Sequence, residues 1–111
     1  MDTYFEVIFL EEAFAFLKSL DDKHATKILY NIRKAQQQQD PELFKKINDN
    51  IWEFRTVYQG LQYRLLAFWD KRDKTNTLVV STHGFVKKQS KVPNNEINRT
   101  EALRAKYFNE K

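Results

Sequence analysis

The sequence predicts an α+β domain in which helices pack on one largely antiparallel sheet. Apolar residues recur at helical spacing between residues 11 and 35, and from residue 51 to residue 83 they alternate with a period of two. Hydrophobic residues make up 41% of the chain, which has only two Gly and two Pro, as expected for a compact globular protein. With 111 residues, the chain 1–111 is predicted to form a single domain.

The N-terminal third predicts one strand followed by two helices. Residues 4–9 (YFEVIF) are mostly β-branched or aromatic and predict a strand with its Phe and Val side chains on one face. An amphipathic helix is predicted for residues 11–20, and Asp21 and Asp22 end it and cap a second helix that runs to about Ala35. Two consecutive amphipathic helices predict a helical hairpin.

The middle of the chain predicts a β-hairpin. Residues 42–47 (ELFKKI) follow Pro41 and are compatible with a helical turn or with an irregular connection into the sheet. Residues 51–57 and 62–69 then predict two strands, joined by a turn at Gln59 and Gly60.

The C-terminal third predicts a third strand of this meander and a last helix. Residues 70–76 (DKRDKTN) form a charged loop, residues 77–83 a strand broken by Gly84, and residues 85–88 a short extended segment. After Pro93 a helix is predicted for residues 96–108, with a weak apolar pattern. The expected order of elements is β, α, α, β, β, β, α.

Composition excludes several classes of chemistry. The absence of Cys excludes disulfides, thiolate zinc sites and cysteine nucleophiles. There is no glycine-rich phosphate loop, no HExxH motif and no nucleophile elbow, and His24 and His83 lie too far apart to suggest a metal site, so neither a metal nor a cofactor is predicted. An acidic start and the lack of an apolar run of about 20 residues argue against export and membrane insertion, which makes the cytoplasm the expected location.

Charge is unevenly distributed along the chain. Residues 1–53 hold seven Lys and Arg against ten Asp and Glu, whereas residues 54–111 hold twelve against five. No acidic residue lies between Asp73 and Glu96. This pattern is compatible with a polyanion-binding surface and also with a solvated basic surface that has no ligand.

Basic and aromatic side chains gather on the predicted strands and at their ends. Because side chains alternate along a strand, Arg55, Arg64 and His83 would share one sheet surface if the three strands pair with matching faces. On the third strand, the same alternation places Val79 on the face of His83. The candidate set is Arg55, Tyr58, Arg64, His83, Phe85, Lys87 and Lys88.

Arg64 has two interpretations. An arginine within the apolar run YRLLAFW is costly to bury without a partner, so it must reach an acid, a carbonyl group or solvent. Glu53, one strand away, offers a structural ion pair. The other interpretation is that Arg64 binds a phosphate at a cleft.

The motifs IWEFR, QYRLLAF and HGFVKK, in this order and followed by a Pro and a final helix with EALRAKY, resemble the HigB-like branch of the RelE/ParE toxin superfamily. The resemblance spans residues 1 to about 108, and HGFVKK is its most specific part. It implies a twisted antiparallel sheet packed against an N-terminal helical hairpin. Relatives that carry a catalytic Tyr or His near the C-terminus are matched poorly, since Tyr107 lies within the predicted helix.

The resemblance implies the toxin of a type II toxin-antitoxin system. Such a protein is a metal-independent endoribonuclease that cuts mRNA on the ribosome and thereby inhibits translation. The expected partners are mRNA and a cognate helix-turn-helix antitoxin, similar to HigA, in a heteromeric complex. Two alternatives stay open: a binding module that poisons DNA gyrase, as on the ParE side of the superfamily, and a domain of this fold that has lost activity.

The implied mechanism uses the 2′-hydroxyl of RNA as nucleophile, so the protein must supply an acid, a base and positive charge. His83 is the candidate base or acid, because an imidazole titrates near neutrality, and Lys87 is its partner if nearby cations depress its pKa. By the resemblance, Arg55 and Arg64 hold the scissile phosphate. The candidates for RNA binding are Lys88 and Lys91 along the backbone and Tyr58 and Phe85 against a base.

Overall fold

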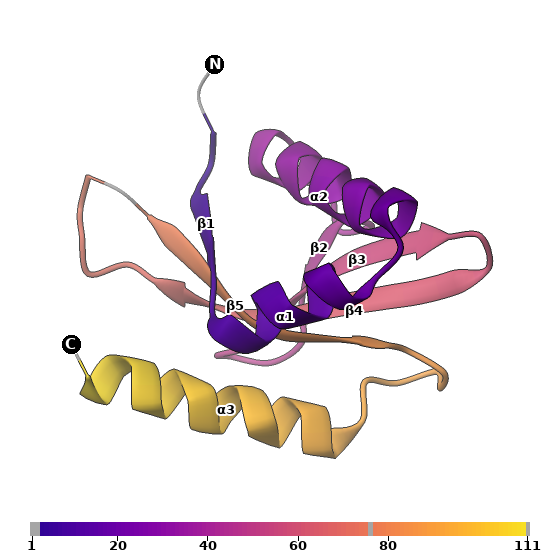
Figure 1. Ribbon diagram of the computed structural model, residues 1–111. Coiled ribbons are helices and arrows are strands. Elements are labelled where there is room, and N and C mark those ends of the chain that lie inside the picture. Colours follow the sequence, from indigo (N-terminus) through magenta and orange to yellow (C-terminus); the bar gives the residue numbers. More distant parts are fainter. Residues whose placement is uncertain (1–2, 76, 111) are drawn as a thin grey trace.

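The computed structural model describes residues 3–75 and 77–110 and forms one mixed five-stranded sheet with helices on both faces (Figure 1). The strands lie in the order β1-β5-β4-β3-β2. Helices α1 and α2 cover one face and α3 covers part of the other (Figure 1). The elements are β1 (Glu6–Phe9), α1 (Glu11–Ser19), α2 (Asp22–Gln37), β2 (Phe44–Lys46), β3 (Trp52–Tyr58), β4 (Leu61–Asp70), β5 (Leu78–Val86) and α3 (Asn94–Asn109).

The predicted α+β class is confirmed, and the strands are antiparallel except at β1, which pairs parallel with β5. The expected order lacks one element, β2. Backbone hydrogen bonds from Leu43 and Phe44 to the carbonyl of Asp40 close a turn, and the chain then enters a short edge strand. Residues 42 and 43 therefore lie in this turn, whereas residues 44–46 form a strand that is neither of the two predicted alternatives. Asn76, at the end of the predicted loop, lies outside the described residues.

The turn between β3 and β4 fixes the register of the central hairpin. Gln59 and Gly60 have φ angles of 50° and 79°, as a two-residue turn of type I′ requires. The predicted turn is confirmed. With only two residues in the loop, Arg55 must lie opposite Arg64 on the neighbouring strand.

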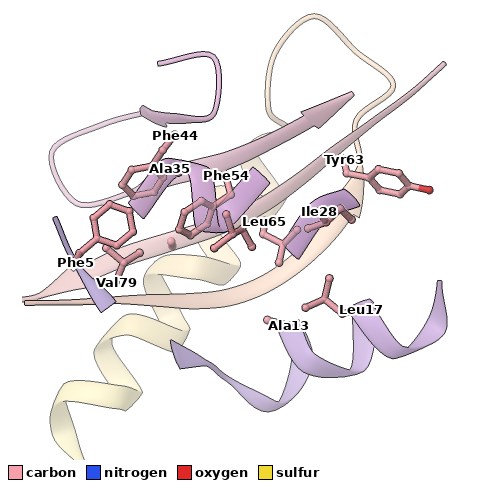
Figure 2. Packing of buried hydrophobic residues seen from close by; sticks show 12 residues of the cluster. Phe5, Ala13, Leu17, Ile28, Ala35, Phe44, Phe54, Tyr63, Leu65 and Val79 are labelled. Carbon is pink, nitrogen blue, oxygen red and sulfur yellow. The ribbon is translucent and has the colours of Figure 1, made fainter. Parts of the chain in front are cut away.

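The main core lies between the sheet and the helices α1 and α2, and it combines aliphatic side chains with a group of aromatic rings (Figure 2). The rings of Phe44 and Phe54 stack with centroids 4.4 Å apart, and Phe5 packs against both. Gly84 lets α1 approach β5 closely, because a Cβ there would lie 2.3 Å from the ring of Phe16. Gly84 lies within the continuous strand β5, so the prediction that it breaks the strand is wrong.

A β-bulge shifts the alternation of β5. Leu66 of β4 pairs with His83, but the next residue, Ala67, pairs with Ser81, so Thr82 has no partner on β4. Val79 consequently packs in the core beneath α1 and α2, whereas His83 is hydrogen-bonded on the side of α3. The prediction that Val79 and His83 share a face is wrong, since one inserted residue reverses the face of those that follow.

Helix α3 is attached to the sheet largely through polar contacts. The hydroxyls of Thr82 and Thr100 lie 3.2 Å apart, and the Tyr107 hydroxyl donates a hydrogen bond of 2.8 Å to Asp70. The apolar contact is small and centres on Phe68, whose ring centroid lies 5.2 Å from that of Tyr107. The weak apolar pattern of this helix therefore matches its polar mode of docking.

Candidate functional site

The register of the sheet gathers the central charged residues on the face that also carries α3. Arg64 of β4 lies between Arg55 of β3 and Phe85 of β5 as direct cross-strand neighbours. One pair further along, Leu66 lies opposite His83. Since cross-strand neighbours point to the same side of a sheet, Arg55, Arg64 and His83 share this face.

Arg64 is the largest fully buried side chain among the described residues. Its side chain is 1% exposed, and its Nε lies 3.1 Å from Oε1 of Glu53, which is 8% exposed. The guanidinium also donates to the Tyr63 carbonyl oxygen at 3.0 Å and to Gln62 Oε1 at 3.2 Å. Burial lowers the pKa of Arg64 and Glu53 acts against that shift, so the group remains a buried cation. The structural ion pair considered for Arg64 is present.

Glu53 also faces Arg55, which lies nearer to solvent. The Nε of Arg55 lies 3.9 Å from Oε2 of Glu53, and its NH1 lies 3.7 Å from Glu42. Its side chain is 24% exposed, so this guanidinium can reach a ligand outside the sheet. One carboxylate thus stands between one buried arginine and one accessible arginine.

Lys87 completes the cluster at the end of β5. Its backbone N–H donates to the carbonyl oxygen of Gln62 at 2.7 Å, which extends the pairing beyond the strand. Burial lowers the pKa of Lys87, and the cation of Arg64 lowers it further, while Glu53 acts in the opposite direction. Lys45 of the edge strand β2 also adds positive charge here. A half-buried lysine with a lowered pKa is a group suited to proton transfer.

His83 lies on the same face but is enclosed. The residue is 5% exposed, its Nε2 lies 2.8 Å from Oε1 of Glu96 on α3, and its Nδ1 lies 3.1 Å from the Thr82 hydroxyl. Both ring nitrogens are therefore occupied. His83 thus joins β5 to the first turn of α3, and it lies at the bottom of a hollow between α1 and α3 that Phe16, Glu96 and Arg99 also line.

The aromatic candidates are divided between the two faces. The half-buried ring of Phe85 lies beside Arg64 and stacks at 6.1 Å from His83. Tyr58 lies on the opposite face, where it packs edge-on against His24 of α2 at 4.9 Å. Tyr58 is therefore not part of the cluster around Glu53. Lys88 and Lys91 are exposed in the segment that follows β5.

Sequence reasoning assigned no functional role to three residues that the structure places near these candidates: Lys45, Glu53 and Glu96. From the sequence, Glu53 is expected only as an ion-pair partner, although its alternation with Arg55 on one strand is visible there. Lys45 depends on the unforeseen edge strand, and Glu96 depends on how α3 docks, so no sequence signal marks either. Among the described residues, no group of three or more His, Asp or Glu side chains is arranged to hold a metal ion.

Fold and cluster together define a class of protein: a small α+β domain whose sheet carries an arginine and lysine cluster around one carboxylate. A family model described as phage-derived protein Gp49-like (DUF891) matches residues 15–105, so the chain belongs to this family, which is part of the RelE/HigB toxin group. Among curated proteins no relative matches the chain. No helix within the described residues is long and apolar enough to cross a membrane.

Proposed function

We propose that this protein is a HigB-like toxin that inhibits translation by cutting mRNA on the ribosome. The observation that carries the proposal is Lys87, a half-buried lysine with a lowered pKa beside the accessible Arg55 and the buried Arg64. Membership of the Gp49-like family supports the same activity. Proton transfer and phosphate binding are the two functions that RNA cleavage by its own 2′-hydroxyl demands of a protein.

In this proposal Lys87 is the group that transfers the proton and Arg55 contacts the scissile phosphate. A neutral Lys87 takes the proton of the 2′-hydroxyl, or a protonated one donates to the 5′-oxygen that leaves. The fork of Arg55 binds two phosphate oxygens and stabilises the additional charge of the transition state. In the same proposal, the exposed Lys88 and Lys91 follow the RNA backbone and Phe85 contacts a base.

Arg64 and Glu53 act as positioning residues in this scheme. At 1% exposure Arg64 does not reach a phosphate in this conformation, but its charge lowers the pKa of Lys87. Glu53 holds Arg64 in place and lies 3.9 Å from Arg55. The sequence-based choice of His83 as acid or base stays a prediction, and the enclosed ring gives it less support than the geometry gives Lys87.

The proposed partner that controls this activity is a helix-turn-helix antitoxin of the HigA type. An active nuclease of this kind is tolerated in a cell only when a second protein holds it in an inactive heteromeric complex. We therefore expect that expression without such a partner stops growth. Co-expression with the antitoxin encoded beside the toxin gene restores growth.

The proposal is tested by inducing the protein in a bacterium without antitoxin while incorporation of labelled amino acids and thymidine is followed together with mRNA integrity. We expect early loss of protein synthesis with discrete mRNA cuts. Lys87→Ala should abolish both effects, and Lys27→Ala on the outer side of α2 should leave them unchanged. Intact mRNA with early failure of DNA replication would overturn the proposal and favour a gyrase poison.

A further inference from the structure

A hollow lined by both aromatic and charged side chains lies at one end of the sheet. Its volume is about 470 Å³, and two tryptophans and three cations contribute to its lining. Trp52 comes from β3 and Trp69 from β4, with ring centroids 5.6 Å apart at an angle of 81°. These are the only tryptophans of the chain. Both are partly exposed, whereas most large aromatic rings of the neighbouring core are buried.

Trp52 ends a row of stacked rings. Phe54 stacks on Phe44 at 4.4 Å and 24°, and Phe44 stacks on Trp52 at 4.9 Å and 28°. The row starts in the buried core and ends at the rim of the hollow. A flat aromatic ligand can add to such a row without rearrangement of the side chains beneath it.

The charges around the hollow favour an anion. Lys71 places its Nζ 4.9 Å from the centroid of the Trp69 ring, and Arg104 reaches the hollow from α3. Lys46 pairs with Asp49 at 3.9 Å, and both side chains are largely exposed, so this ion pair is weak. Three cations thus line the hollow together with one solvated carboxylate, which suits a ligand that combines a flat ring with a phosphate.

The hollow is connected to the cluster around Glu53 through the edge strand β2. Lys45 of this strand lies opposite Glu53, and the next residue, Lys46, lies opposite Trp52. Because successive side chains of a strand point to opposite faces, positive charge continues around the edge of the sheet. Trp52 lies three residues before Arg55 on β3, which is about 10 Å along a strand.

We propose that this hollow binds one nucleotide of a single-stranded RNA, at a distance from the bond that is cut. The base packs against Trp52 and Trp69, and its phosphate lies among Lys46, Lys71 and Arg104. The inference rests on the proposed RNA cleavage and adds a subsite to it. Its consequence is that RNA passes around the β2 edge from the cluster to the tryptophans and is held at two points.

The test uses the fluorescence of the two tryptophans. The full chain is titrated with a short single-stranded RNA in which every 2′-hydroxyl is methylated, so that the strand binds without being cut. We expect saturable quenching that weakens as salt is raised. The double variant Lys71→Met with Arg104→Met should weaken binding at least about five-fold, and Trp52→Leu should weaken it about five-fold to a hundred-fold, since a stacked base contributes that much.

Lys27→Met is the matched control, because it removes a lysine that lies over the Tyr30 ring on α2, away from the hollow. Thermal unfolding of each variant separates loss of binding from loss of fold. If Trp52→Leu unfolds, the double variant Lys71→Met with Arg104→Met still tests the subsite. Inorganic phosphate and adenosine are titrated separately. Any one of three results would overturn the subsite: no quenching by RNA, equal quenching by phosphate alone, or unchanged RNA binding by the double variant.

The subsite and the cleavage activity can fail independently. If wild-type protein cuts mRNA in cells but the methylated RNA does not quench the tryptophans, only the subsite is wrong. If the RNA quenches them and the double variant loses this, but induced protein leaves mRNA intact, the subsite stands and the proposed cleavage is wrong. Binding that depends on Arg55 but not on Lys71 or Arg104 would place the RNA at the cluster alone and overturn the subsite.

Discussion

The two faces of the sheet carry different kinds of side chains. Beneath α1 and α2 the sheet presents a continuous apolar core that contains Phe5, Phe44 and Phe54. On the opposite face, the apolar contact with α3 is small, and much of the rest is charged or polar, including a buried ion pair between Arg64 and Glu53. Burial of apolar surface gives the first face its stability, whereas buried charge on the second face has an energetic cost that is offset only by close partners. This difference is the reason for proposing the second face as the functional one.

The largest effect is expected from Lys87→Arg, which keeps the positive charge of the polar face but removes proton transfer near neutral pH. If Lys87 transfers a proton, the rate of RNA cleavage should fall about 10²-fold to 10⁴-fold. Cleavage is measured on ribosomes that translate a defined mRNA. Lys27→Arg is the control on the outer side of α2.

A pH profile distinguishes the two possible roles of Lys87. The pKa of Lys87 lies below the ordinary lysine value of about 10.4 because of burial and of Arg64. If the neutral amine is the base, activity rises with pH through this lowered pKa, and if the ammonium is the acid, activity falls there. An Arg variant that retains full activity would leave Lys87 with an electrostatic role only.

Arg64→Met tests whether the ion pair on the polar face is a structural requirement. Removing Arg64 leaves the buried Glu53 with only the longer contact of 3.9 Å to Arg55, and should lower the free energy of unfolding by up to about 3–5 kcal/mol. The double variant Arg64→Met with Glu53→Leu should recover most of that loss, because the buried pair is gone and the partly exposed Arg55 keeps Glu42 as a partner at 3.7 Å. Urea unfolding measures all three proteins. A single variant as stable as wild type would contradict the assignment of Arg64 as a buried cation.

The contrast between the apolar and the polar face also explains which parts of the fold and of the site can be predicted from the sequence. Periodicity correctly predicts the helices and long strands, and a two-residue turn at Gln59 and Gly60 is sufficient to place Arg55 opposite Arg64. The edge strand β2 has three residues, too few for a period, and its conformation is set by pairing with β3.

The polar face depends more on tertiary contacts than on local pattern. The bulge at Thr82 reverses the alternation after it, so the face of His83 cannot be read from Val79. The contact between His83 and Glu96 depends on how α3 docks, and that docking uses hydroxyl and carboxylate groups that leave no apolar period in the sequence. Lys87 was nevertheless a candidate from the motif alone, and the lowering of its pKa required the structure.

Gly84→Ala tests the apolar face. The new Cβ would lie 2.3 Å from the Phe16 ring, so α1 or the ring must move away from β5. Overpacking of this kind lowers the free energy of unfolding by about 1–3 kcal/mol. The variant is compared by thermal unfolding with Phe16→Leu and with the double variant, in which the smaller side chain makes room. If the double variant is no more stable than Gly84→Ala alone, the close approach of α1 is not the reason for glycine at this position.

The smallest effect is expected from Tyr107→Phe, which removes one hydrogen bond between α3 and the polar face. The Tyr107 hydroxyl donates to Asp70 at 2.8 Å, and Arg72 donates to both oxygens of the same carboxylate. Loss of one such bond should lower the free energy of unfolding by about 1 kcal/mol at pH 7.

Acid tests the same carboxylate through Asp70→Asn, because part of the stability of the wild type depends on an ionised Asp70. Hydrogen bonds from Arg72 hold the pKa of Asp70 far below its ordinary value of about 3.9, with a further contribution from Tyr107. A carboxylate with a depressed pKa contributes its full stability above the unfolded pKa and loses it as pH falls toward the folded one. The advantage of wild type over Asp70→Asn should therefore shrink as pH falls below about 4, because the variant lacks this part of the acid dependence, whereas the difference between wild type and Tyr107→Phe should persist there, because Asp70 stays ionised in both folded proteins. Equal stability of wild type and Tyr107→Phe at pH 7 would mean that Tyr107 fixes α3 through its ring against Phe68, which the variant keeps, and that the apolar contact holds the helix even on the polar face.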